Sequence, residues 1–155
     1  MDLLYFEDFT PGEIVQYGDI EVTGGRIKAF AEQFDPQPFH LDETAARDTM
    51  AGGLIASGWH TAGMLMRMNC DNFLNRSAAQ GAPGIAEVNW LKPVRPGDRL
   101  SVRRTTVGAR PSASRPELGI VDFTFEVLNQ LGEATMTQKN VILFSRRPAG
   151  EGAAR

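Results

Sequence analysis

The sequence has few of the residues that build disulfides and metal centres. Its 155 residues include one cysteine, Cys70, and two histidines, His40 and His60. One cysteine cannot form a disulfide within the chain, and disulfide-free proteins are typical of intracellular compartments. Because zinc sites are built mainly from cysteine and histidine, we expect no metal. The chain also lacks a glycine-rich phosphate loop, and we predict no bound cofactor.

An excess of basic charge and long apolar runs are missing too. The chain has sixteen lysines and arginines and nineteen aspartates and glutamates, which gives a net charge of -3. Nucleic-acid binding usually needs an excess of basic residues. No segment approaches the roughly 20 apolar residues of a membrane span. Residues 1–9 carry three acids and no basic side chain, unlike a secretory signal peptide. We therefore expect a cytoplasmic protein that contacts neither nucleic acid nor membrane.

What remains is the composition of an ordinary globular protein. Hydrophobic residues make up 42% and charged residues 23% of the chain, and this length suits one domain with its own core. We assign residues 1–146 to that domain. The tail, 147–155, is rich in small and polar residues, and we expect it to be disordered.

The first half of the chain has helical patterns. After Thr23, a good N-cap residue, apolar side chains recur at i, i+3, i+4 and i+7 until Asp35-Pro36 ends the helix. A short helix is predicted at 43–47, where Asp42 is the cap. From about 57 to 76 apolar residues cover nearly the whole circumference, which predicts a long, buried helix.

Strand patterns dominate the second half. We predict strands at 85–93, 99–107, 121–127 and 133–145, one or two short strands within 13–22, and a loop at 108–118. Strands joined by short turns pair antiparallel. The fold class is therefore α+β, with one curved antiparallel sheet wrapped around the long helix.

One stretch, FDPQPFH at 34–40, combines a carboxylate, a histidine and two prolines. Each proline fixes its own φ and disfavours helix in the residue before it. We therefore expect a stiff, non-helical connector with Asp35 and Gln37 extended. Such a connector would hold Asp35 and His40 around one substrate as an acid/base pair. The alternative is that the prolines only end a helix and turn the chain.

Taken together, this stretch and three others resemble the MaoC-like dehydratases, or (R)-specific enoyl-CoA hydratases. The four stretches, in order, are FTPG at 9–12, FDPQPFHLD at 34–42, GLIASGWH at 53–60 and LKPVRPGD at 91–98. The resemblance implies a hotdog fold, in which an antiparallel sheet wraps a central helix. It also implies a homodimer or a dimer of dimers, with the acyl chain near the subunit interface.

The same resemblance implies a reaction. Water would add reversibly to a trans-2-enoyl-CoA to give an (R)-3-hydroxyacyl-CoA, with Asp35 and His40 as the catalytic dyad. The backbone N–H of Gly58, at the start of the central helix, would bind the thioester oxygen. Helix N-termini present unpaired N–H groups and a positive dipole end, and glycine leaves room for the substrate. Which of Asp35 and His40 takes a proton from C2 stays open.

Three neighbours of the dyad are candidates for substrate binding. Gln37 stands where the family commonly has asparagine. Ser57 would contact substrate or cap the helix, and His60 would face the thioester or pack inside the fold. Asp35, partly desolvated beside Phe34, is expected to be a stronger base than usual. Some relatives have a serine eight residues after the glycine, where this chain has a methionine, residue 66.

Arginines are candidates for the CoA phosphates, because a guanidinium matches phosphate geometry. Arg110 and Arg115 flank a loop rich in serine and proline and are the preferred pair; the alternative is a solvated loop. Arg103 and Arg104 are expected on a solvated strand face.

Two other functions compete with the hydratase. An acyl-CoA thioesterase needs a carboxylate aimed at the carbonyl carbon, often on the central helix, where the only acid is Asp71. A non-catalytic acyl-CoA-binding subunit would keep the fold but is expected to lose the Asp35/His40 pair. Acyl length, branching and the choice between CoA and acyl carrier protein are left open by the sequence.

Overall fold

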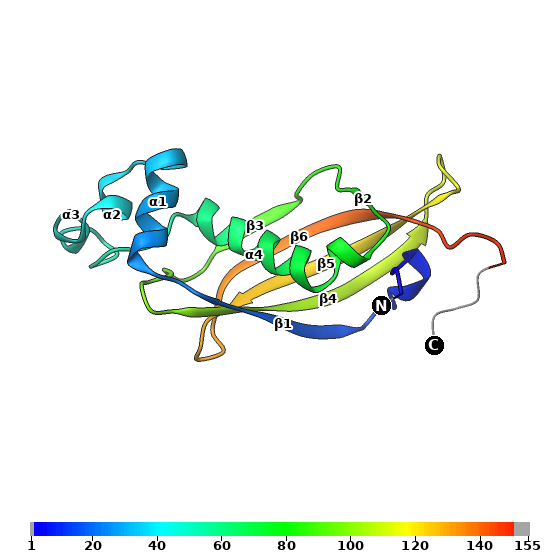
Figure 1. Cartoon of the computed structure of the whole chain (residues 1–155), viewed down its shortest axis with the longest axis horizontal. Helices are drawn as coiled ribbons and strands as arrows, with labels where there is room; N and C mark the ends of the chain where they lie inside the picture. Colours follow the sequence, from blue (N-terminus) through cyan, green and yellow to red (C-terminus); the bar gives the residue numbers. More distant parts are fainter. Residues whose placement is uncertain (1, 151–155) are drawn as a thin grey trace.

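A computed structural model describes residues 2–150. In it, an antiparallel sheet of six strands curves around the helix α4 (Figure 1). The strand order is β1-β4-β5-β6-β2, and β3 pairs with another part of β6. The strands are β1 Ile14–Glu21, β2 Ala79–Gly81, β3 Glu87–Trp90, β4 Arg99–Pro111, β5 Leu118–Leu128 and β6 Ala134–Ser145. The helices are α1 Gly24–Phe34, α2 Pro38–Leu41, α3 Glu43–Arg47 and α4 Gly58–Asn72, with 3-10 turns η1 Phe6–Asp8 and η2 Leu74–Arg76. The α+β class and the sheet around a central helix are as predicted.

The core lies between α4 and the inner face of the sheet. Alternate side chains of β5 are fully buried, as their period of two predicted: Val121, Phe123, Phe125 and Val127. Phe73, just past the end of α4, packs against Phe123 with ring centroids 5.9 Å apart. Each buried ring of this kind contributes about 1.5–3 kcal/mol through removal from water. Packing on the long strands therefore fixes where α4 lies.

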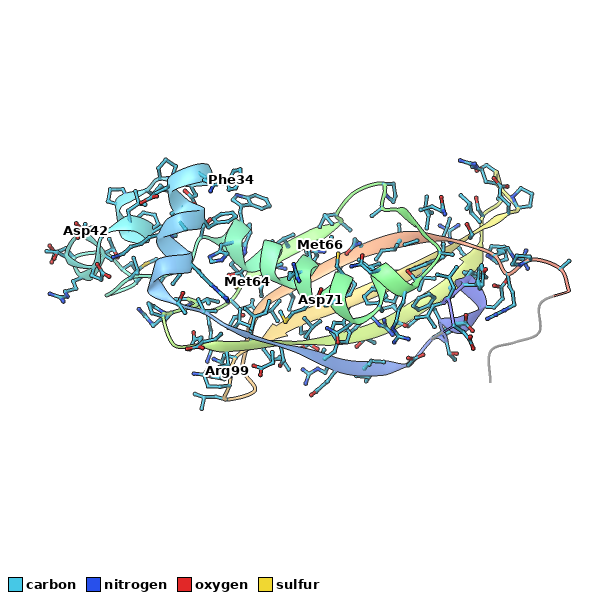
Figure 2. The ribbon with its side chains drawn as sticks, in the orientation of Figure 1. Phe34, Asp42, Met64, Met66, Asp71 and Arg99 are labelled. Atoms are coloured by element: carbon cyan, nitrogen blue, oxygen red, sulfur yellow. The ribbon has the colours of Figure 1, made fainter. Side chains whose placement is uncertain are left out.

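The sheet covers one side of α4. Thr61, Leu65 and Met68 are buried against the sheet, whereas Trp59 and Met66 are 62% and 50% exposed. Figure 2 labels Met66 on this helix. The prediction of a helix buried all round is therefore wrong for the single chain, because the sheet covers one face and the contacts of α1 and β3 near the start of the helix leave Trp59 and Met66 exposed. The helix also ends at Asn72, before the predicted 76.

The shorter helices gather beside the start of α4 (Figure 1). Their predicted caps are confirmed: Thr23 Oγ accepts from the backbone N–H of Arg26 at 3.2 Å, and Asp42 accepts from that of Ala45 at 2.9 Å. The prediction of a non-helical connector is wrong at Pro38–Leu41, which forms α2. Proline is tolerated there because it occupies the first helical turn, where no intrahelical N–H bond is lost.

Several boundaries differ from the predictions. β4 extends to Pro111 and β5 begins at Leu118, so the connecting loop is shorter than 108–118. In the expected tail, the guanidinium of Arg147 donates to both carboxylate oxygens of Asp8 at 2.7 Å, and residues 151–155 lie outside the described part. No helix within residues 2–150 is long and apolar enough to cross a membrane.

Arg104 lies in the core, which corrects the expectation of a solvated position. It is 5% exposed, and its guanidinium carbon lies 4.5 Å from the ring centroid of Phe73. Its only carboxylate partner among the described residues is Glu13, at 3.5 Å. Arg104 shares a face of β4 with Leu100 and Val102 because side chains two apart on a strand point the same way. Burial lowers the pKa of Arg104.

Candidate active site

Asp35 and His40 meet where α1 ends and α2 begins. Asp35 is the C-cap residue of α1, and His40 lies in α2. The turn through Gln37, whose backbone is extended at φ -83° and ψ 143°, brings His40 Nε2 to 3.3 Å from Asp35 Oδ2. His40 is 4% exposed. The structure thus brings together the two residues predicted as a dyad.

A backbone carbonyl sets the orientation of the His40 ring. His40 Nδ1 lies 2.7 Å from the carbonyl oxygen of Ile55. Because a carbonyl only accepts hydrogen bonds, Nδ1 must carry the proton. In the neutral imidazole, Nε2 is then the bare nitrogen, and it is the one that faces Asp35. The ring is therefore held with its basic atom toward the carboxylate.

Two side chains donate to the Asp35 carboxylate. Ser57 Oγ donates to Oδ2 and Gln37 Nε2 donates to Oδ1, each at 2.6 Å. The Ser57 hydrogen bond lowers the pKa of Asp35 most, and the Gln37 hydrogen bond and the charge of His40, when its ring is protonated, lower it further; together they outweigh desolvation. The expectation of a strengthened base is therefore wrong, because hydrogen bonds to the charged form outweigh the partial burial.

Gly58 opens α4, and the indole of Trp90 lies against it. Trp90 Nε1 donates to the Gly58 carbonyl oxygen at 2.9 Å. A Cβ on Gly58 would lie 2.5 Å from Trp90 Cε2, so glycine here makes room for this indole rather than for the substrate alone. The Gly58 N–H has no acceptor within residues 2–150. It is therefore available to a ligand at the positive end of the helix.

A cavity of about 400 Å³ joins these groups, a size typical of small-molecule sites. Asp35, Gln37, His40 and Gly58 line it together with apolar side chains from α4 and from the segment after β3. The other lining residues are Ile55, Ala56, Trp59, Thr61, Trp90, Leu91, Lys92, Pro93, Val94 and Thr135. The sequence reasoning missed Trp90, although it directly precedes the LKPVRPGD stretch.

Two further predicted residues, Ser57 and His60, do not line this cavity. Ser57 is fully buried and caps α4, accepting from the N–H of Trp59 at 3.3 Å, and it does not line the cavity. His60 stacks on Phe30 with ring centroids 4.8 Å apart and lines a separate cavity. Burial, then nearby Arg26, lowers the pKa of His60.

The predicted phosphate-binding arginines are remote from the dyad. Arg110 lies near the end of β4, and Arg115 lies in the β4–β5 connection, where it pairs with Glu117 at 2.9 Å. This hairpin and the helices α1–α3 stand at opposite ends of the molecule (Figure 1). The single chain does not bring either arginine to the cavity.

Comparison with known proteins agrees with this architecture. The MaoC like domain family model matches residues 8–123. Mesaconyl-CoA hydratase from Cereibacter sphaeroides is 36% identical over 150 residues, which are 92% of this chain but only 41% of that protein. The crystal structure of a MaoC-like dehydratase from Rhodospirillum rubrum superposes with a TM-score of 0.83 at 43% identity, covering 94% of this chain and 99% of that one.

A more distant likeness concerns the fold alone. A Mycobacterium tuberculosis protein with a double hotdog fold aligns with a TM-score of 0.76 at 14% identity, covering 98% of this chain and 47% of that one. The sheet around α4 matches that fold, and the family model spans most of the chain. This chain therefore belongs to the MaoC-like domain family and has the hotdog fold.

Proposed function

We propose that this protein reversibly hydrates a trans-2-enoyl-CoA to an (R)-3-hydroxyacyl-CoA. Family membership makes it a hydratase or dehydratase in general. The observation that carries the finer proposal is the approach of His40 Nε2 to Asp35 Oδ2, at 3.3 Å, in the cavity that Gly58 also lines. An acid/base pair beside an oxyanion donor is the machinery that hydration of an unsaturated thioester requires.

The geometry supports separate roles for the two members of the dyad. Asp35 is stabilised as a carboxylate, so it accepts a hydrogen bond from the reacting water without keeping its proton. His40 Nε2 is the bare nitrogen beside it and moves the proton. The reacting water would donate one hydrogen to the Asp35 carboxylate and the other to Nε2 of His40.

In hydration, the water oxygen bonds to C3 while one water proton moves to Nε2 of His40. The electron pair of the C2=C3 bond shifts toward the thioester carbonyl, whose oxygen accepts from the Gly58 N–H. The imidazolium then gives its proton to C2, and the net change is the addition of one water. An oxyanion donor of this kind contributes about 3–4 kcal/mol to rate.

A short acyl group is part of this proposal. The cavity of about 400 Å³ is bounded by the indoles of Trp59 and Trp90, which pack edge to face with centroids 5.2 Å apart. The mesaconyl-CoA hydratase relative supports a CoA thioester as substrate. Because the chain spans 41% of that protein, its activity is carried over here only as part of the proposal.

The thioesterase alternative has little support in the geometry. Asp71 lies in the C-terminal half of α4, away from the α1–α3 end where Asp42 lies (Figure 2). Its carboxylate is paired with Arg67 at 2.8 Å, so it is not aimed at a thioester beside Gly58. A non-catalytic subunit is disfavoured because the dyad is assembled and hydrogen-bonded.

We also propose that the protein works in the cytoplasm.

We further propose that two copies associate through the exposed face of α4 and the neighbouring edge strand β3. Trp59 contacts Trp90 on this face, and Met66 and Ile85 line a common cavity there. All four side chains are 46% to 62% exposed. Exposed apolar side chains grouped in this way are typical of an interface, and an edge strand leaves backbone groups unpaired.

The test is an assay of purified protein with crotonyl-CoA. Loss of enoyl absorbance is expected, and Asp35→Asn and His40→Gln should each lower kcat/KM by roughly 10²–10⁴-fold, the usual contribution of an acid/base group. Circular dichroism should show that both variants fold. Release of free thiol would instead indicate a thioesterase, and binding without turnover a non-catalytic subunit; either result would exclude the hydratase.

A further inference from the structure

Ser57 joins the dyad to the helix that carries the oxyanion donor. Its side chain is fully buried between the end of α1 and the start of α4. The hydroxyl donates to Asp35 Oδ2 at 2.6 Å and accepts from the Trp59 N–H at 3.3 Å. A hydroxyl has one proton, and here the carboxylate receives it.

The oxygen that Ser57 binds is the one that faces the imidazole. Asp35 Oδ2 lies 3.3 Å from His40 Nε2, while Gln37 holds Oδ1 at 2.6 Å. With both oxygens bound, the carboxylate cannot rotate about its Cβ–Cγ bond without losing a hydrogen bond. Its Oδ2 is therefore fixed relative to the imidazole and relative to α4.

We infer that Ser57 is a positioning residue, which locks the Asp35 carboxylate to the first turn of α4 so that the dyad and the Gly58 N–H form one rigid unit. The inference rests on the proposed hydratase function. Ser57 directly precedes Gly58, so the Gly58 N–H is part of the peptide bond that joins the two residues. One side chain thus sets the distance between the proton-transfer groups and the oxyanion donor.

Capping alone does not account for this arrangement. A helix cap needs only an oxygen acceptor, which the Ser57 hydroxyl supplies to Trp59. The donation to Asp35 is a second interaction, and its 2.6 Å length is typical of a charge-assisted O–H···O⁻ bond. The lowered pKa of Asp35, caused mainly by this bond, is consistent with a carboxylate held in its charged form.

The test compares Ser57→Ala with Thr23→Ala. Thr23 caps α1, the helix that ends at Asp35, but makes no bond to the carboxylate, so it controls for loss of a cap. We expect Ser57→Ala to lower kcat for crotonyl-CoA by about 10- to 100-fold, the loss expected for a hydrogen bond to a charged group. KM should change little, because Ser57 does not line the cavity. Thr23→Ala should lower the Tm while kcat stays at the wild-type value.

A second measurement does not depend on turnover. The side-chain carboxyl ¹³C signal of Asp35, assigned by its loss in Asp35→Asn, should titrate at higher pH in Ser57→Ala than in the wild type. Ser57→Thr, which keeps the hydroxyl, should titrate as the wild type does. An unchanged Asp35 titration and an unchanged kcat in Ser57→Ala would overturn the inference. Failure of the proposed function would look different, because wild-type protein would then not hydrate crotonyl-CoA.

Discussion

At the scale of single residues, hydrogen bonding rather than burial controls the chemistry of Asp35. Partial burial beside Phe34 predicts a raised basicity, but Ser57 and Gln37 both donate hydrogen bonds to the carboxylate. Since each favours the charged form, the net effect is a lowered pKa. This difference matters for the proposed mechanism, in which the weakly basic carboxylate orients water and the imidazole moves the proton.

The lowered pKa of Asp35 predicts a pH dependence of stability. A carboxylate with a folded-state pKa below its unfolded value stabilises the fold above the unfolded pKa, about 3.9 for aspartate, and this contribution is lost as pH falls through the folded-state pKa. The unfolding free energy of the wild type should therefore fall more steeply below about pH 4 than that of Asp35→Asn. Urea unfolding at a series of pH values measures this. Parallel curves for the two proteins would contradict the prediction.

Gly58 yields a second prediction at this scale. A methyl group on residue 58 would meet the indole of Trp90, so Gly58→Ala should destabilise the protein by about 1–3 kcal/mol, the usual cost of overpacking. The double variant Gly58→Ala/Trp90→Ala should lose less than the sum of the two single changes, because the clash is gone. Urea unfolding of all four proteins gives the coupling. If the losses in unfolding free energy were strictly additive, contact with Trp90 would not be the reason for glycine at position 58.

At the scale of elements, β4 carries a charge into the core. Arg104 points inward with its apolar neighbours, and its Nε has no hydrogen-bond partner within residues 2–150. A buried cation with a single carboxylate at 3.5 Å recovers little of its desolvation cost. Aromatic rings partly replace the lost water, since the guanidinium lies over four of them.

We therefore expect Arg104→Met to leave stability within about 1 kcal/mol of the wild type or to raise it, because an apolar side chain of similar length replaces a poorly paired charge. Arg104→Ala is the matched comparison, and it should cost about 2–5 kcal/mol by leaving a cavity. Denaturant midpoints report both values. A large loss in the methionine variant would indicate that the cation–aromatic contacts stabilise the fold more than this account allows.

The helix α4 shows the limit of pattern reading for an element. Its apolar residues cover most of the circumference, which predicts burial on every side, yet the sheet of one chain covers a single face. Trp59 and Met66 both belong to this apolar pattern, and both are exposed. The pattern reports which surfaces avoid water, and it does not say whether the same chain or another one covers them.

At the scale of the whole molecule, that uncovered face predicts self-association. Met66→Lys places a charge in the proposed interface and should convert the proposed dimer to a monomer, as measured by light scattering after size-exclusion chromatography. Leu131→Lys is the control, because Leu131 is 75% exposed in the β5–β6 turn and should leave the dimer intact. A wild-type protein that elutes as a monomer would contradict the proposal.

Much of the fold follows from local patterns. The caps Thr23 and Asp42, the alternation along β5 and the breaks at proline are each set by the chemistry of residues a few positions apart. The pairing of Asp35 with His40 was equally accessible, because a short, proline-restrained turn cannot place them far from each other. Helix α2 was missed because proline opposes helix in general but not in a first turn.

The sequence by itself therefore determined the fold class, the proximity of Asp35 to His40 and the start of the helix that Gly58 opens, since these depend mainly on residues close in the chain. Only the tertiary structure decided what surrounds them. Ser57 meets Asp35 across 22 positions, and Trp90 meets Gly58 across 32. Such contacts arise when separate elements pack on one sheet, and no local periodicity encodes which side chains will then touch. For the same reason the structure alone places Arg104 in the core and Arg110 far from the site.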